Sequence, residues 1–459
     1  MMGSETRASR LDDEVQSLGT RVRLGRLVGD LFSGALASAA LKLSSSGASF
    51  LTSLLLARFL GASGYGTYAY AMACVGLLGT PFLGLDSLLV RYVVTYESRS
   101  AWGSIRGVLR RTCLAILFSS LFLAFGSLAV AWLLARRFES QTLVVFCIAL
   151  LSLPLAALTR WAQGAIRGFH RVVLGYVPEM VLRPLLFGAL ISGGYVFLRS
   201  DFSAAWAVGF QVIAAAIALL WALCLLKRAR PDAVRQAAAV YDARAWIRSA
   251  LSLVLVSGIQ GMNSRIPTII LGAVENPDAV GVYAAASQWA QQISFLLLAT
   301  NMTLGPALAR LYQSGDIKQV QSLVTRSARM AWGFSLPVAG GLILWGDRFL
   351  SLFGADFVAG WAALVLLSVG ELVNAGAGSV GLLLIMTGNE RDVAVGIGIS
   401  TALNLLLSLL LVPVAGIEGA AIASMSSLIG WNLLLAVFVH RRLGITSGIF
   451  GDLGGRWKR

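Results

Sequence analysis

Histidine, cysteine and charge are scarce in this 459-residue sequence, and each shortage excludes a class of protein. Only two histidines are present, so no histidine-based metal site or catalytic triad can form within an apolar stretch. The four cysteines are scattered singly through apolar runs, which is typical of buried packing thiols. No P-loop lysine follows any glycine cluster, which excludes the common ATPase signature. We therefore expect no catalytic residue, no metal and no cofactor.

Low charge and high hydropathy indicate a membrane protein. Charged residues make up 13% of the chain, against roughly 25% in soluble domains, and the mean hydropathy is +0.77. Twelve apolar stretches can cross ~30 Å of hydrocarbon as helices, centred near residues 47, 80, 123, 153, 185, 215, 261, 294, 340, 372, 403 and 429. Barrel strands would alternate polar and apolar residues instead. The sequence predicts an all-α polytopic membrane protein with twelve transmembrane helices.

The net charge of +15 reflects membrane topology and does not indicate nucleic-acid binding. With the N-terminus placed in the cytoplasm, 29 of the 37 lysines and arginines fall on the inner side and five on the outer side. The other three, Lys42, Arg183 and Arg265, lie inside predicted spans. The positive-inside rule thus predicts that both termini are cytoplasmic and that the basic residues face anionic membrane lipids.

Two short motifs repeat in the same order in the two halves of the chain. Gly66 in "GASGYGTY" matches Gly281 in "VENPDAVGVY", 215 positions later. Further on, "RGFHR" at 167–171 matches "TGNER" at 387–391, at a spacing of 220. Each half has six spans, so both halves enter and leave the membrane on the same side. The sequence therefore predicts a parallel repeat of two pseudo-symmetric six-helix bundles, with substrate bound between them.

These features divide the chain into five expected segments. They are a cytoplasmic N-terminal segment (1–32), an N-terminal lobe (33–226), a cytoplasmic linker (227–248), a C-terminal lobe (249–442) and a basic cytoplasmic tail (443–459). In the first segment Leu11, Val15, Leu18 and Val22 share one helical face, which indicates an interfacial helix. A solvated tail that happens to be amphipathic is the alternative.

The order of the motifs resembles a known family over about residues 35 to 443. "LLLARFLGASGYGTYAYAMACVGLLGTPFLGLDSLLVRYV" in the first half and "NSRIPTIILGAVENPDAVGVYAAAS" in the second are similar to the polysaccharide transporter family of the multidrug/oligosaccharidyl-lipid/polysaccharide exporter superfamily. One position departs from the family pattern, because Ser264 stands where an acid often lies beside the residue equivalent to Arg265. An ion-coupling role for this position is therefore in doubt.

The resemblance implies a V-shaped pair of six-helix bundles that works by alternating access. Such proteins move undecaprenyl-diphosphate-linked oligosaccharides from the inner to the outer leaflet of the bacterial cytoplasmic membrane, for O-antigen, capsule or exopolysaccharide assembly. The implied partners are this lipid-linked oligosaccharide and membrane lipids, together with a glycan polymerase and glycosyltransferases. The resemblance implies a transporter and not an enzyme.

The basic residues inside the spans are the first candidates for substrate binding, because each needs a partner or a wet cavity in the bilayer. Arg265 has no acid within one turn, and Gly258 and Gly261 leave space on its helical face. We expect Arg265 to bind the diphosphate of the implied substrate through its planar guanidinium. Donation to helix-end carbonyls near Pro267 is the alternative.

Arg183 and Lys42 are two further candidates. Glu179 lies one turn before Arg183, so a structural ion pair explains this arginine as well as a substrate role does. Lys42 lies in the inner third of the first span, before a helix-weakening "SSSG", and either binds the arriving diphosphate or snorkels to the interface.

Uncharged polar residues and the remaining acids form a second group. Gln288 and Gln291 share one face of the eighth span, and Glu371 and Asn374 share one face of the tenth. The amides suit sugar hydroxyls, although such stripes also join helices through hydrogen bonds. Glu371 and Asp86 are the candidates for proton or sodium coupling, with placement near the interface as the simpler explanation of Asp86.

Three other functions stay open at this point. A cation-coupled multidrug exporter of the same superfamily would need acids in its cavity, yet the first span has neither Asp nor Glu. A lipid II flippase of the same fold usually has two further spans. The third alternative, from a different class, is a non-transporting membrane scaffold for glycan enzymes, which would move neither lipid nor drug.

Overall fold

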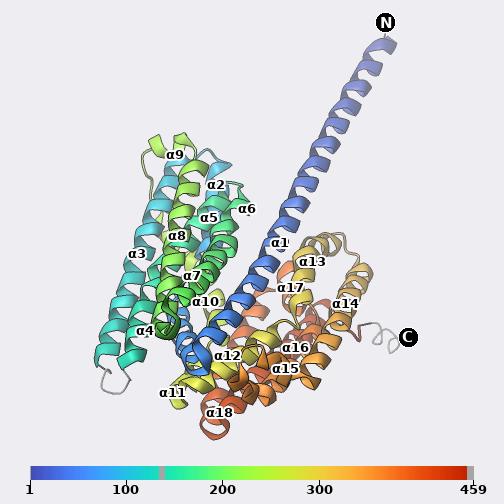
Figure 1. Cartoon of the computed structure of the whole chain (residues 1–459). Helices are drawn as coiled ribbons and strands as arrows, with labels where there is room; N and C mark the ends of the chain where they lie inside the picture. Colours follow the sequence, from blue (N-terminus) through green and yellow to red (C-terminus); the bar gives the residue numbers. More distant parts are fainter. Residues whose placement is uncertain (1, 134–139, 452–459) are drawn as a thin grey trace.

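A computed structural model describes residues 2–133 and 140–451 of the chain, and the side chains of most of them from Ala40 onward. In these ranges every regular element is a helix (Figure 1). Seven of the described helical stretches are long and apolar enough to cross a membrane, and the longest are Ala40–Leu78 and Glu390–Leu443. The predicted all-α polytopic membrane class is thus confirmed.

The helices form two lobes that are consecutive in the sequence (Figure 1). The N-terminal lobe contains α1 (Met2–Leu78), η1 (Thr80–Phe82), α2 (Leu85–Glu97), α3 (Trp102–Leu133), α4 (Ser140–Leu150), α5 (Ser152–Gly168), α6 (Val172–Val177), the π-helical turn η3 (Pro178–Leu182), α7 (Arg183–Leu198), η4 (Arg199–Asp201) and α8 (Ala204–Ala229). A short helix, α9 (Asp232–Gln236), lies in the connection between the lobes.

The C-terminal lobe contains α10 (Ala243–Asn263), α11 (Ile266–Val274), α12 (Pro277–Gln291), α13 (Phe295–Gln313), α14 (Ile317–Leu344), α15 (Gly346–Ser351), η5 (Ala355–Gly360), α16 (Trp361–Ala377), α17 (Val380–Met386) and α18 (Glu390–Leu443). The predicted interfacial helix at 1–32 lies outside the residues whose side chains are described. Residues 452–459 of the predicted basic tail lie outside the described residues.

Two glycines turn single long helices into pairs of spans. α1 reverses at Gly61, whose φ is 67°, and α18 reverses at Gly416, whose φ is 51°. Both values lie in the left-handed region, which glycine enters without the steric cost that a side chain brings. With these two turns, the order of helices agrees with the predicted twelve spans. Gly61 opens the "GASGYG" motif, so this motif makes a tight connection between the first two spans.

The lobes meet at the end of the molecule that holds these turns, which we call the turn end. One continuous apolar core there combines Leu56 and Tyr65 of α1 with Tyr283 of α12 and Phe353 and Phe357 near α15. Separate cores fill each lobe toward the opposite end, where α9 lies and which we call the linker end. The helices of the two lobes diverge toward the linker end (Figure 1). This arrangement matches the V shape implied by the family resemblance.

The two glycines that match across the repeat touch each other at the lobe interface. A Cβ added to Gly66 would lie 1.7 Å from the Pro277 carbonyl oxygen and 2.8 Å from the Gly281 nitrogen. A Cβ added to Gly281 would lie 2.2 Å from the Ala62 carbonyl oxygen. Backbone therefore packs directly on backbone here, which only a residue without a side chain permits. The repeated glycine of the sequence thus marks the pseudo-symmetry axis.

The connection between the lobes is fixed to the N-terminal lobe. The Val240 amide donates to the Gly103 carbonyl at 3.0 Å, and the Trp246 indole donates to the Tyr96 hydroxyl at 2.9 Å. The Arg106 guanidinium donates to the Ala237 carbonyl at 2.7 Å. The beginning of α10 therefore belongs physically to the N-terminal lobe, although the sequence places it in the second half.

We expect that Gly66→Ala weakens the contact between α1 and α12, because the new methyl group meets the Pro277 carbonyl and not a flexible side chain. Overpacking of this kind costs about 1–3 kcal/mol of unfolding free energy, so the thermal unfolding midpoint in detergent should fall. Gly47→Ala is the matched control, since a Cβ there meets nothing within 4 Å. An unchanged midpoint for Gly66→Ala would contradict the direct backbone contact.

Candidate functional site

Three neighbouring hollows lie in the N-terminal lobe, and the Arg183 side chain lines all of them. The first, of about 170 Å³, lies between the second span, α5, α8 and Arg265. The second, of about 360 Å³, extends past Lys42 and Tyr176, and the third, of about 130 Å³, lies between α1, α7 and α8. Together we call them the basic cavity. It brings together Lys42, Arg183, Arg265 and Asp86, which the sequence singled out separately.

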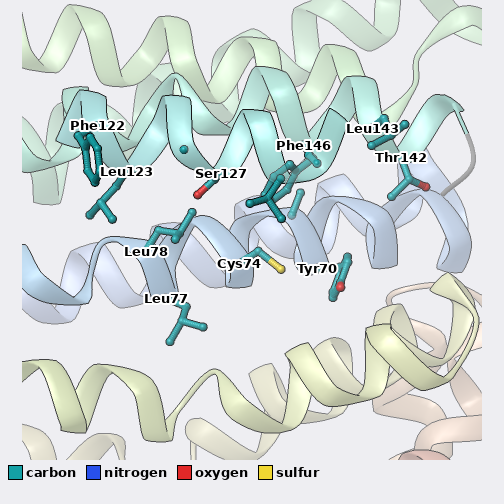
Figure 2. Close-up of a pocket in the computed structure, with 14 residues that line it drawn as sticks. Tyr70, Cys74, Leu77, Leu78, Phe122, Leu123, Ser127, Thr142, Leu143 and Phe146 are labelled. Atoms are coloured by element: carbon teal, nitrogen blue, oxygen red, sulfur yellow. The ribbon is translucent and has the colours of Figure 1, made fainter. Parts of the chain in front are cut away.

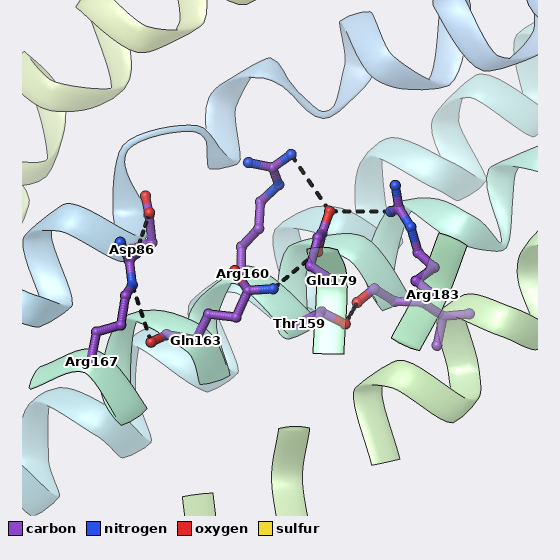
Figure 3. A network of polar contacts seen from close by, with 8 residues as sticks. Asp86, Thr159, Arg160, Gln163, Arg167, Glu179 and Arg183 are labelled. Atoms are coloured by element: carbon purple, nitrogen blue, oxygen red, sulfur yellow. Dashed lines mark hydrogen bonds and ion pairs between the residues drawn. The ribbon is translucent and has the colours of Figure 1, made fainter. Parts of the chain in front are cut away.

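The backbone around Glu179 is irregular, and two prolines explain why. Pro178 opens the π-helical turn η3, and Pro184 lies in the first turn of α7. Proline lacks the amide hydrogen that continues an α-helix, so the helix adopts a π turn between them. Within this turn Glu179 lies between Arg160 of α5 and Arg183 of α7 (Figure 3). The Arg183 Nη1–Glu179 Oε1 distance is 3.2 Å, and the Arg160 Nη2–Glu179 Oε1 distance is 3.9 Å.

A chain of hydrogen bonds continues from Glu179 to Asp86 (Figure 3). The buried Gln163 amide donates to Glu179 Oε2 at 3.2 Å, and Arg167 Nε donates to the Gln163 carbonyl at 3.4 Å. Arg167 Nη2 then forms an ion pair with Asp86. Gly164 allows this pairing, because a Cβ there would lie 2.7 Å from the Asp86 Cα atom. Asp86, a predicted ion-coupling candidate, is thus paired with Arg167.

Arg265 lies between α10 and α11, where the seventh span is broken as the proline at 267 predicts. Its Nη1 donates to the Gly261 carbonyl at 2.6 Å, which is the helix-end contact considered as an alternative. The guanidinium also lines the basic cavity, so the helix-end contact leaves it at the cavity wall. Gly76 of the second span gives it room, because a Cβ there would lie 2.1 Å from Arg265 Nε.

Lys42 lies at the cavity edge beside Tyr176. Its Nζ is 5.8 Å from the centre of the Tyr176 ring, and the Arg167 guanidinium lies 4.8 Å from the same ring. Arg167 Nη1 also donates to the Tyr176 hydroxyl at 2.7 Å. The ring thus contacts two cations, which stabilises positive charge without neutralising it.

The cavity is basic overall, and this decides what it can bind. Three arginines and one glutamate line its central hollow. The Arg160 side chain is 41% exposed, and its ion pair with Glu179 is long, at 3.9 Å. Arginine offers planar pairs of donors that match carboxylate and phosphate oxygens. The arrangement therefore favours an anion, and a phosphate-containing one above all.

The sequence argument missed Arg160, Gln163 and Arg167 as site residues. Arg160 and Arg167 were assigned to the inner surface, because the positive-inside rule counts basic residues near span ends. Their spacing in "RWAQGAIR" contained the signal, since positions i, i+3 and i+7 share one helical face. That face of α5 points at Asp86 and Glu179 (Figure 3).

The C-terminal lobe holds a polar cluster of different character. Ser294 and Asn374 both donate to the Glu371 carboxylate, at 2.5 and 3.2 Å, and Asn432 donates to the Asn374 carbonyl oxygen at 3.0 Å. Glu371 and Asn374, which were predicted to share a face, thus lie together. Gln288 lies at the lobe interface, where its amide donates to Ser53 at 3.3 Å, and Gln291 is exposed.

Comparison with protein families gives one match over most of the chain. The family described as "Polysaccharide biosynthesis protein" matches residues 31–312. Two proteins of Haloferax volcanii are similar in sequence. The probable flippase AglR is 30% identical over 171 residues, 36% of this chain and only 35% of AglR. The probable low-salt glycan biosynthesis flippase Agl15 is 21% identical over 383 residues, 82% of this chain and 77% of Agl15.

Comparison with solved structures shows the fold. A multidrug resistance MATE family transporter in an inward-facing conformation has a TM-score of 0.71 at 13% identity, covering 88% of this chain and 98% of that one. The lipid II flippase MurJ in an inward closed conformation has a TM-score of 0.70 at 12% identity, covering 89% of this chain and 87% of that one. The fold alone therefore does not separate a drug exporter from a lipid flippase.

We expect Arg167→Met to destabilise the protein, because it leaves Asp86 charged without its partner. The Arg167 side chain is 12% exposed and the Asp86 side chain 27%. Removal of one partner from a buried ion pair costs about 3 kcal/mol of unfolding free energy. The double variant Asp86→Asn, Arg167→Met should recover most of this loss in thermal unfolding in detergent.

The exposed pair of Arg235 and Asp232 supplies the control for this prediction. The two side chains are 46% and 79% exposed and Arg235 Nη1 lies 3.3 Å from Asp232 Oδ1, so Arg235→Met should change the unfolding midpoint little. Equal changes of the unfolding midpoint in the two single variants would show that loss of Arg167 costs no more than loss of an exposed arginine.

Proposed function

The chain belongs to the polysaccharide biosynthesis protein family, and from this premise we propose that it moves undecaprenyl-diphosphate-linked oligosaccharide from the inner to the outer leaflet by alternating access. The observation that carries this proposal is the basic cavity, where three arginines and one glutamate line a hollow within the membrane-spanning bundle. A diphosphate supplies the anion that this excess of guanidinium groups lacks. The names of AglR and Agl15 support the flippase class.

Arg160, Arg183 and Arg265 are the proposed diphosphate ligands. Glu179 lies 3.9 Å from Arg160 and 3.2 Å from Arg183. A diphosphate has more oxygens and more charge than this single carboxylate, so it competes well for the same donors. Lys42 lies at the linker-end side of the cavity and meets the diphosphate first.

Neutral polar groups near the arginines are the proposed sugar contacts. Ser49, Thr52 and Gln211 line the smallest hollow beside Arg183, and Gln288 reaches Ser53 from the other lobe. Hydroxyl and amide groups can both donate to and accept from sugar hydroxyls. Gln291 and Asn374 of the C-terminal lobe are further proposed sugar contacts.

The closed contact at the turn end gives the direction of access. The apolar core and the Gly66–Gly281 contact join the lobes there, while the helices diverge at the linker end. We place the linker end in the cytoplasm, in agreement with the distribution of lysine and arginine. The described conformation then receives substrate from the inner leaflet of the bacterial cytoplasmic membrane, beside a glycan polymerase and glycosyltransferases. The segment boundaries predicted from the sequence stand as part of this proposal.

Glu371 and Asp86 are the proposed coupling residues. Glu371 accepts hydrogen bonds from Ser294 and Asn374, so its carboxylate is held by neutral groups only in these contacts. Proton or sodium binding there changes the charge of the C-terminal lobe without disturbing the arginines. Asp86 has the weaker case, because Arg167 already compensates its charge.

The multidrug exporter is the second transporter considered. A cationic drug needs carboxylates in the cavity, whereas the central hollow is dominated by arginines. A scaffold for glycan enzymes needs no polar cavity inside its membrane span, and each charge kept there costs free energy. Both alternatives therefore explain less of the site than the flippase does.

We predict that Arg265→Ala lowers delivery of labelled lipid-linked sugar to the outer leaflet of a deletion strain by about tenfold or more, because one bidentate phosphate ligand is lost. Arg265→Lys should retain part of the activity, since it keeps the charge and loses only the planar geometry. The readouts are outer-leaflet labelling and recovery of surface glycan.

Arg348→Ala is the matched control, because Arg348 lies exposed on α15 and outside the cavity lining. It should restore delivery as the unmodified protein does. Full delivery by Arg265→Ala would overturn the ligand assignment. Normal delivery and normal surface glycan in the deletion strain itself would overturn the flippase function.

A further inference from the structure

An apolar seam crosses the lipid-facing side of the N-terminal lobe, outside the basic cavity. One hollow of about 410 Å³ lies between the second half of α1, α3 and α4, with Tyr70, Cys74 and Phe146 in its lining (Figure 2). A second hollow of about 320 Å³ lies between η1, α2, α3 and α10. Leu123 lines both hollows, so they adjoin at this side chain. We call the pair the α3 seam.

A single stripe of α3 forms one wall of the seam throughout. Its residues recur every three or four positions, from Thr112, Ala115 and Ser119 past Leu123 to Gly126 and Val130. Positions at this spacing share one face of a helix. Several residues on that face are small, and a Cβ at Gly126 would meet nothing within 4 Å.

The length of the seam distinguishes between a phospholipid acyl chain and a longer apolar chain as its occupant. Its lining on α3 begins at Arg111, at the linker end, and ends at Ala131 near the turn end. Twenty residues of helix rise about 30 Å, which equals the full hydrocarbon thickness of a bilayer. A phospholipid acyl chain stays within one leaflet, about half of this distance. The seam therefore fits one chain that is longer than a leaflet is thick.

Only the second span separates the seam from the basic cavity. Leu77 and Leu78 line the seam, whereas Gly76 and Gly79 on the other side of the same helix line the cavity beside Arg265. Phe82, where this span is interrupted between α1 and α2, lines both spaces. A ligand with its charged end in the cavity can thus place an apolar chain against the adjoining outer face.

We propose that the α3 seam binds the isoprenoid chain of the carrier lipid while the diphosphate occupies the basic cavity. The inference rests on the proposed function, because that function supplies a ligand with a charged end and a chain longer than one leaflet. Lipid chains are as apolar as leucine, so affinity comes from van der Waals packing in a preformed groove. The seam remains beside the chain as the headgroup crosses, because it extends through both leaflets.

The test compares carriers of two chain lengths in proteoliposomes. Disaccharide diphosphates on an undecaprenyl chain and on a geranyl chain carry the same headgroup, and only the first is long enough to fill the seam. Gly126→Trp fills the groove without meeting protein atoms at Cβ. We expect it to slow transfer of the undecaprenyl substrate about tenfold and to leave transfer of the geranyl substrate within about twofold.

Gly333→Trp is the matched control. Gly333 is likewise an exposed helical glycine whose Cβ would meet nothing within 4 Å, but it lies on α14 outside the seam. It should change neither rate by more than about twofold. The proposal is overturned if Gly126→Trp leaves undecaprenyl transfer unchanged, or if it slows both substrates equally.

Photolabelling separates failure of this inference from failure of the proposed function. Undecaprenyl diphosphate with a diazirine on its chain should label α3 within 112–131, and Gly126→Trp should remove this label. If the unmodified protein transfers neither substrate, the proposed flippase function is wrong. The photolabel then shows by itself whether the isoprenoid chain binds in the seam. Absence of the α3 label overturns the seam, as does equal labelling by a diazirine phospholipid that excess undecaprenyl diphosphate does not displace.

Discussion

A charged side chain inside a bilayer must be paired, hydrogen-bonded or in contact with water, and the N-terminal lobe is organised around this requirement. Ion pairs and hydrogen bonds connect Asp86 to Arg167, then through the uncharged Gln163 to Glu179. Glu179 in turn contacts Arg160 and Arg183. The acids compensate part of the basic charge and orient it. The uncompensated remainder faces the cavity, where an anionic substrate can complete the series.

The need to compensate a charge in the membrane also links the cavity to the connection between the two lobes. The seventh span is divided between them, because Trp246 at the start of α10 packs in the N-terminal core, whereas Leu271 of α11 packs in the core at the turn end. Arg265 lies at the break, with its guanidinium beside Gly76 of the other lobe. In the proposed mechanism, an anion bound to Arg265 would therefore act at the point where the chain passes from one lobe to the other.

Sequence reasoning identified the fold class and matched Gly66 with Gly281, because both inferences depend on local patterns, although it did not predict that the two glycines touch. Span length follows from hydropathy, and Gly66 and Gly281 stood out because the repeat uses the same residue for the same backbone contact. The basic cavity was found only in part. Arg183 and Arg265 could be recognised as charges far from span ends. Arg160 and Arg167 could not, because a hydropathy pattern does not tell how deep in the membrane a residue of a tilted helix lies. The partner of Asp86 depends on how α2 crosses α5, which no local pattern specifies.

The two lobes differ more in chemistry than their common fold suggests. Basic residues gather in the N-terminal lobe, whereas the cluster around Glu371 in the C-terminal lobe consists of one carboxylate held by serine and asparagine. A symmetric ligand would have no use for this difference. A carrier lipid is asymmetric in the required way, since its diphosphate is anionic and its glycan is rich in hydroxyl groups. Gly66 and Gly281 contact each other at the lobe interface. In the proposed mechanism the repeat would thus supply matching lobes for movement, while the divergence of their side chains would supply the polarity that one asymmetric ligand needs.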